Sequence, residues 1–234
     1  MATDVIVEAK NIGKRYGEGD AAVDALTNAN LTIHPGEVLV IQGPSGSGKT
    51  TLLSIMGLLL RPTTGELFVH GQPTAHLPER DLPNLRATVF GFVFQGFYLF
   101  APLTALENVV LGTRMKNPKI SSAEAEREAT QLLEAVGLKH RLHHHPANMS
   151  GGEKQRVAIA RALGGGPQAI LADEPTAALD TKSALGVVEL LQHLAKERHR
   201  AVVLVTHDHR LDRYADRVVI VEDGQIMSSG SPTQ

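Results

Sequence analysis

The stretch Gly43-Pro-Ser-Gly-Ser-Gly48-Lys49-Thr50 decides the fold of this 234-residue chain. It fits the pattern G-x-x-x-x-G-K-[ST], in which glycines let backbone N–H groups turn inward around an anion and the lysine adds a full positive charge. Val38 to Ile41, just before it, are all apolar, as expected of a strand buried on both faces, and a helix is expected from about Lys49 to Leu59. This order favours a phosphate-binding loop over a glycine-rich turn without a nucleotide.

A second apolar stretch, Ala169 to Ala172, ends in two adjacent carboxylates, Asp173 and Glu174. In P-loop NTPases an acid at the end of such a strand holds Mg²⁺. The neighbouring Glu174 is then free to polarise a water molecule as a general base. On their own, two acids fit a solvated strand end equally well, and the upstream loop is what favours the magnesium site.

The remaining pattern predicts an α/β fold: a P-loop NTPase core with a mixed sheet, an N-terminal antiparallel β part and an inserted all-helical lobe. We expect one domain, with residues 1–95 and 164–234 as the core and about 96–163 as the lobe. Capping boxes at Thr104 and Ser150 indicate helix starts in the lobe. The strands expected in the core are Val5–Ala9, Ala25–Ile33, Glu37–Gln42, Glu66–His70, Phe90–Phe94, Ala169–Ala172, Ala201–Thr206 and a hairpin around Asp223-Gly224.

A third motif, Met149-Ser-Gly-Gly-Glu-Lys-Gln-Arg156, which we call the signature, begins a helix. Ser150 and Glu153 form its capping box, and a cap alone would explain them. Two adjacent glycines at a helix N-terminus, however, also make a second anion-binding site.

The phosphate loop, the acidic strand and the signature, in this order and with this helical insertion, resemble the ATP-binding subunits of ABC transporters over nearly the whole chain. The resemblance implies ATP and Mg²⁺ as ligands and gives further residues their roles. Tyr16 would stack on adenine, Gln95 would sense Mg²⁺, Asp180 would belong to the D-loop, and His207 would hold the γ-phosphate and the attacking water. The residues implied to bind ATP are Tyr16, Gly43, Pro44, Ser45, Gly46, Ser47, Gly48, Lys49, Thr50 and Thr51, and those implied to hold magnesium are Thr50, Gln95 and Asp173.

By the same resemblance, two copies of the chain face each other head to tail and enclose two ATP molecules. Ser150, Gly151, Gly152 and Glu153 of one copy would then cover the γ-phosphate bound by the other. The signature departs from the family at Met149 and Glu153, where Leu and Gln are usual. The added negative charge near a phosphate would weaken closure unless Lys154 or Arg156 offsets it.

The resemblance also implies a membrane permease as a partner. Phe97, Tyr98, Leu99 and Phe100 follow Gln95 and are candidates for an exposed docking surface, although they could equally pack inside the lobe. The segments 90–111 and 206–218 look similar to ATPases of the macrolide-exporter, lipoprotein-releasing and glycolipid-exporter group. An importer ATPase is the alternative within this class, and a soluble ABC ATPase or a P-loop kinase are the alternatives outside it.

Composition excludes other classes. The formal net charge is -2, so general coating of nucleic acid is not expected, and the absence of cysteine excludes a disulfide framework and a zinc-thiolate site. The N-terminus shows no signal peptide, and the most apolar run, Leu52 to Leu60, is too short to span a bilayer. A cytoplasmic location, peripheral on the inner face of the membrane through the partner, is therefore expected. His143-His144-His145 is interpreted as a solvated loop rather than a metal site.

Overall fold

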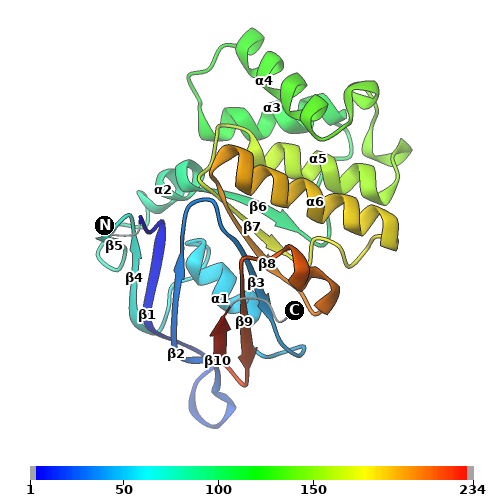
Figure 1. Cartoon of the computed structure of the whole chain (residues 1–234). Helices are drawn as coiled ribbons and strands as arrows, with labels where there is room; N and C mark the ends of the chain where they lie inside the picture. The colour runs from blue at the N-terminus through cyan, green and yellow to red at the C-terminus, as the bar shows by residue number, and fades with distance from the viewer. Residues whose placement is uncertain (1–3, 231–234) are drawn as a thin grey trace.

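The computed structural model of the chain describes residues 4–230, and its strands form two sheets (Figure 1). In the core sheet the strand order is β10-β9-β3-β8-β7-β6. Strands β9, β3, β8, β7 and β6 are parallel, and β10 is antiparallel to β9. The bounds, in that order, are Gln225–Gly230, Arg217–Glu222, Val38–Gln42, Ala201–Val205, Ala169–Asp173 and Phe90–Phe94. The predicted mixed sheet is confirmed.

The second sheet is the predicted antiparallel part and has the order β2-β1-β4-β5. Its strands are Val23–Ile33, Val7–Tyr16, Thr64–Val69 and Gln72–Pro73. Strand β1 is longer than the predicted Val5–Ala9 because its polar second half still pairs with β2, with register shifts between Ala9 and Arg15. Polar side chains obscure such a half-exposed strand in the sequence.

The two faces of the core sheet belong to two separate apolar cores. Leu39 and Ile41 of β3 face helix α1 (Lys49–Met56) and the antiparallel sheet, so α1 lies between the two sheets (Figure 1). Val38 and Val40 face the other way, toward helices α3 to α6. All five residues of β3 and of β8 are buried, as the apolar runs predict. Helix α1 ends at Met56, before the predicted Leu59.

The predicted helical lobe contains α3 (Ala105–Lys116), α4 (Ser122–Ala135) and α5 (Gly151–Leu163). Capping boxes begin all three of these helices, at Thr104, Ser121 and Ser150. Helix α6 (Thr181–Arg198) follows β7, and α2 (Leu82–Val89), which was not predicted, precedes β6. The division at residues 96 and 163 remains a prediction, and residues 1–3 and 231–234 of the predicted core lie outside the described part. No helix within residues 4–230 is long and apolar enough to cross a membrane.

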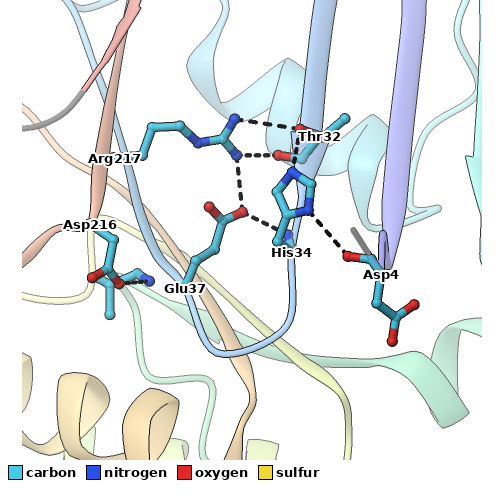
Figure 2. A network of polar contacts seen from close by, with 7 residues as sticks. Asp4, Thr32, His34, Glu37, Asp216 and Arg217 are labelled. Atoms are coloured by element: carbon cyan, nitrogen blue, oxygen red, sulfur yellow. Dashed lines mark hydrogen bonds and ion pairs between the residues drawn. The ribbon is translucent and has the colours of Figure 1, made fainter. Parts of the chain in front are cut away.

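A polar network ties the antiparallel sheet to the core sheet at the edge opposite the phosphate loop (Figure 2). Arg217 at the start of β9 donates to the backbone oxygen of Thr32 and, at 3.0 Å, to the carboxylate of Glu37. Glu37 also accepts from the backbone N–H of His34 at 2.7 Å. The carboxylate of Asp216 accepts from the first N–H of β3 at 2.8 Å. Both sheets are thereby held at the amino ends of the parallel strands.

Candidate active site

The glycine-rich segment of residues 43–51, which we call the nucleotide loop, follows β3 at the carboxyl end of the core sheet and includes the first three residues of α1. Strands β7 and β8 are parallel to β3 in the same sheet and end beside it. In open α/β sheets this edge is where ligands bind. The topology therefore brings the residues that follow β3, β7 and β8 into one site.

The N-terminus of α1 is built to receive an anion. Its N-cap residue, Gly48, has φ 101°, and a Cβ there would collide with the backbone oxygen of Ala25. No side chain caps this helix and its first turn contains no acid, whereas α3, α4 and α5 each have a capping box. The free N–H groups and the helix dipole at this end favour a phosphate.

Lys49 places a positive charge inside the nucleotide loop. Only 7% of the residue is exposed, and its ammonium donates to the backbone oxygens of Gly43 at 2.8 Å and Pro44 at 2.7 Å. Among the described side chains, no carboxylate lies within 4.0 Å of this ammonium as an ion-pair partner. Because a buried cation held only by neutral groups lacks a counter-charge, the loop fits a phosphate.

Thr50 and Asp173 form a pair of oxygen donors suited to Mg²⁺. The hydroxyl of Thr50 donates to the two carboxylate oxygens of Asp173 at 3.0 and 3.2 Å. Burial raises the pKa of Asp173, and the adjacent Glu174 acts in the same direction, while the Thr50 hydrogen bond and Lys49 oppose them. A hard cation that brings positive charge to this carboxylate would offset the cost of its burial.

Glu174 lies beside this pair in an uncommon backbone conformation. Its φ is 47°, and its N–H donates to the backbone oxygen of Val205 in β8 at 2.9 Å. Its carboxylate lies 2.9 Å from Nδ1 of His207, which is the residue that follows Thr206 at the end of β8. The structure thus brings Lys49, Thr50, Asp173, Glu174 and His207 together, as the sequence predicts.

The other predicted ligand residues lie around this centre. Gln95 follows β6, whose last residue Phe94 pairs with Asp173, so Gln95 lies at the same sheet edge with an exposed side chain. Tyr16 ends β1 and is exposed, with the ammonium of Lys14 5.3 Å from its ring centroid. In the loop itself, Pro44, Ser45, Gly46 and Thr50 are exposed, Gly43, Gly48 and Thr51 are half-buried, and Ser47 and Lys49 are buried.

The signature is on a different part of the same chain. Ser150 is the N-cap of α5, and Gly152 packs so closely on α6 that a Cβ would lie 2.8 Å from the Ser183 hydroxyl. Ser183 in turn donates its N–H at 3.0 Å to Asp180, the N-cap of α6, and these bonds lower the pKa of Asp180. The signature and Asp180 are therefore neighbours, while no hydrogen bond or ion pair between described residues joins either to the nucleotide loop.

The counter-charge of Glu153 is Arg141, which the sequence did not indicate. Nε of Arg141 lies 2.8 Å from the Glu153 carboxylate, and the predicted alternatives, Lys154 and Arg156, form no ion pair with it among the described residues. Arg141 lies 12 residues earlier in a short turn, so no helical spacing links the two in the sequence.

The histidine cluster contacts the same arginine. Nη1 of Arg141 lies 3.2 Å from Nε2 of His144, which is half-buried, whereas His143 and His145 are exposed. No three His, Asp or Glu side chains that the structure describes are arranged to hold a metal ion.

An apolar groove with a volume of about 490 Å³ lies next to Gln95 and separates α2 from α3 and α5. Tyr98 and Phe100 line it and are 69% and 52% exposed, whereas Phe97 and Leu99 are half-buried. Phe97 and Tyr98 have φ of 59° and 46°, and Arg161 donates to the backbone oxygens of both. Of the four residues considered for docking, two thus face outward and two pack against the lobe.

Comparisons with known proteins agree with this geometry. Residues 26–177 match a family model described as ABC transporter. The chain is 45% identical to the lipoprotein-releasing system ATP-binding protein LolD of Psychrobacter arcticus, over 94% of this chain and 96% of that protein. It is 43% identical to the macrolide export ATP-binding/permease protein MacB of Wolinella succinogenes over 97% of its own length, but spans 35% of that longer protein. A solved dimeric structure of a post-hydrolysis state of the ATP-binding cassette MJ0796, bound to ADP and Pi, has a TM-score of 0.89 and 41% identity, covering 97% of this chain and 99% of that one.

Proposed function

Because the chain belongs to the ABC transporter family of ATP-binding proteins, we propose that it binds and hydrolyses ATP to power a transporter in a membrane. The observation that carries this proposal is the buried ammonium of Lys49 inside an uncapped helix N-terminus, next to Thr50, Asp173 and Glu174. Positioning and neutralisation of charge are most of what phosphoryl transfer requires from a protein.

The nucleotide loop binds the phosphates of ATP in this proposal. The backbone N–H groups of residues 43–51 surround the phosphate oxygens, and the ammonium of Lys49 neutralises part of their charge. Tyr16, exposed at the end of β1, offers its ring to the adenine. Thr50, Asp173 and Gln95 are the oxygen donors for Mg²⁺, and the ion, when bound, neutralises charge that develops on the phosphate oxygens.

Glu174 and His207 carry the hydrolytic step. The carboxylate of Glu174 takes a proton from a water molecule as the water oxygen attacks the γ-phosphorus, and the bond from that phosphorus to the bridging oxygen of ADP breaks. Nδ1 of His207 holds the Glu174 carboxylate at 2.9 Å, which leaves Nε2 of the exposed ring to face the γ-phosphate. The unusual backbone of Glu174 at φ 47° fixes the acid at this position.

Two copies act together. The signature residues Ser150, Gly151, Gly152 and Glu153, with Asp180 beside them, are not joined to the nucleotide loop of their own chain, so they are available to the loop of a second copy. The dimeric state of the cassette MJ0796, a structure similar to this chain, supports this head-to-tail arrangement. A single copy would therefore bind ATP but hydrolyse it slowly.

The partner in the membrane is a permease subunit that docks in the apolar groove beside Tyr98 and Phe100. The described lining of this groove contains aromatic side chains and three basic residues, Arg86, Lys116 and Arg161, and no acid. A segment with apolar side chains and a carboxylate is the complement to such a surface. Docking there would place the chain on the inner face of the cell membrane, in the cytoplasm.

The names of the relatives favour an exporter or a lipoprotein- or lipid-release system over an importer. The relative MacB joins an ATP-binding part and a permease in one protein, and LolD is the ATP-binding protein of a releasing system. The permease chooses the cargo, so its chemistry is set outside this chain. No nucleic acid is expected as a partner, in keeping with the net charge of -2.

The test is a titration of the purified chain with ATP and Mg²⁺, together with phosphate release. Lys49→Ala removes charge-assisted hydrogen bonds and should weaken ATP binding by about 10- to 100-fold. Lys119→Ala, at an exposed site in the lobe, is the matched control and should bind like the unchanged chain. Absence of ATP affinity in the unchanged chain, or full affinity after Lys49→Ala, would refute the proposal.

A further inference from the structure

Helices α3, α4 and α5 each begin with a capping box of the same sequence pattern. In the signature, however, the glutamate carboxylate has a different set of hydrogen-bond donors. In the first two, the hydroxyl of Thr104 or Ser121 donates to the glutamate carboxylate, at 2.8 Å to Glu107 and 2.7 Å to Glu124. In the signature, the carboxylate of Glu153 is held by the N–H of Ser150 at 2.8 Å and by Nε of Arg141 at 2.8 Å. Arg141 thus supplies a stronger second donor than the Ser150 hydroxyl does.

The tip of α5 carries one hydroxyl and two backbone N–H groups. The hydroxyl oxygen of Ser150 accepts from the N–H of Glu153 at 3.2 Å, and the hydroxyl makes only the weakest of the side-chain and backbone hydrogen bonds to the Glu153 carboxylate. Gly151 and Gly152 are the first two helical residues, whose N–H groups have no acceptor within a helix. One hydroxyl and two N–H groups therefore lie at the N-terminus of α5, where the helix dipole favours an anion.

The Glu153 carboxylate is charged at neutral pH and lies at the same helix end. The N–H of Ser150 holds the pKa of Glu153 below its ordinary value, and Arg141 and the Ser150 hydroxyl act in the same direction, while burial opposes them. The pair is partly shielded from water, with the Glu153 side chain 13% and the Arg141 side chain 34% exposed. Without Arg141, this acid would repel the phosphate that the signature is proposed to contact.

The fold fixes Arg141 in place. It lies in the turn Lys139–Arg141, and the segment that follows is bonded to the start of α3. The N–H groups of Ala105 and Leu106 donate to the backbone oxygens of His144 and Leu142 at 2.8 and 2.9 Å. The arginine is therefore held by the lobe and not by a mobile surface loop.

We propose that Arg141 is a positioning residue for the signature. By holding and neutralising the Glu153 carboxylate, it leaves the Ser150 hydroxyl and the N–H groups of Gly151 and Gly152 to the γ-phosphate of the ATP that the second copy binds. This inference rests on the proposed head-to-tail dimer. The fifth residue of this signature is the acid Glu153. In this inference, Arg141 is what allows such a signature to close on ATP.

The experiment measures ATP-dependent dimerisation by sedimentation in the full chain with Glu174→Gln, which blocks hydrolysis. Adding Arg141→Ala should raise the dimer dissociation constant about tenfold, and adding Glu153→Gln to that variant should restore it to within about twofold. ATP binding to the dilute single copy should be the same in all of these proteins. Lys139→Ala is the matched control, because Lys139 is in the same turn but pairs with Glu134 at 2.8 Å.

The outcomes separate the inference from the proposed function. Unchanged dimerisation after Arg141→Ala, or a defect that Glu153→Gln does not reverse, would overturn the role of Arg141 while leaving the dimer intact. If Arg141→Ala lowers the thermal midpoint, Arg141→Lys keeps the charge and should dimerise within about threefold of the reference. A reference protein that binds ATP and never dimerises would instead overturn the head-to-tail dimer itself, and the role of Arg141 with it.

Discussion

Nδ1 of His207 lies 2.9 Å from the carboxylate of Glu174, and the two residues come from the ends of neighbouring parallel strands, β8 and β7. Glu174 reaches this position with φ at 47°, a conformation that few residues other than glycine adopt. The contact therefore orients an acid next to Asp173 without using any part of the nucleotide loop. It links the proposed base to His207, whose side chain is exposed at this edge.

Glu174→Gln should separate ATP binding from hydrolysis. The amide keeps an oxygen that can accept from His207 but cannot take a proton from water, so phosphate release should fall by at least about 100-fold. ATP affinity should stay within about threefold, because the loop and Lys49 are unchanged. Phosphate release and ATP titration on the same protein give both values.

The control for this change is Glu189→Gln, which removes an exposed acid from α6. It should keep full activity. Phosphate release that survives Glu174→Gln would show that another group, such as His207, takes the proton.

Lys116 should make stability depend on pH. Burial lowers the pKa of Lys116 to about 7, with Arg200 acting in the same direction and Glu128 opposing, and its ammonium donates to the backbone oxygen of Ala162 at 2.6 Å. The unfolded chain then binds more protons here than the folded chain between pH 7 and the ordinary lysine range, so stability rises with pH across that window.

Lys116→Met should remove this contribution. Between pH 7 and 9.5 the free energy of unfolding in urea should then rise less steeply with pH than in the unchanged chain. The difference between the two slopes should be at most about 1.4 kcal/mol per pH unit. The variant should be more stable at pH 7, and the difference should narrow as pH rises. Lys119→Met should keep the original slope, and an equal slope in Lys116→Met would contradict the prediction.

Arg217→Ala should destabilise the chain without changing ATP affinity. The guanidinium bonds to Glu37 and to the backbone of Thr32 at the edge opposite the nucleotide loop, and its loss leaves the partly buried Glu37 carboxylate without its cation (Figure 2). The free energy of unfolding should fall by about 2–3 kcal/mol. Arg213→Ala, an exposed arginine nearby, should cost under about 0.5 kcal/mol. Equal losses in the two variants would argue against the network.

Much of the fold could be predicted because its signals are local. The apolar runs of β3, β7 and β8 and the capping boxes at Thr104 and Ser150 each lie within a few neighbouring residues. The second half of β1 and helix α2 were missed because their pattern of apolar residues is weak. Leu82 and Val89 are the only buried residues in α2, so the sequence there has too few apolar residues to show a helical period.

The site, like the fold, has some residues that the local sequence predicts and others that it misses. The nucleotide loop, Asp173 and Glu174 are continuous motifs, so the sequence alone predicts that they lie at the carboxyl end of the core sheet. Arg141 was missed because a contact with Glu153 across two separate segments depends on how the lobe packs, which no spacing records. The aromatic residues after Gln95 were undecided for a related reason: strained backbone at Phe97 and Tyr98 turns some of them outward, and Arg161, far along the chain, holds that turn.

Tyr98→Asp should abolish association with the membrane subunit and leave ATP binding intact. The ring is 69% exposed at the mouth of the apolar groove and contacts Phe94 edge-on at 5.5 Å between ring centroids, so the change removes an aromatic anchor and adds a charge. Aspartate adopts the left-handed backbone of this position, at φ 46°, more readily than tyrosine does, so a loss of binding would not come from the turn.

The measurement is co-purification of the chain with the permease, expressed together and extracted in detergent. Tyr98→Asp should lower the recovered permease by at least about tenfold, whereas Met227→Asp, which changes a 61% exposed apolar side chain on β10, should not. Because the nucleotide loop is untouched, both variants should bind ATP as tightly as the unchanged chain. Full recovery of the permease with Tyr98→Asp would place the docking surface elsewhere, and equal losses in both variants would mean that any added surface charge disrupts the complex.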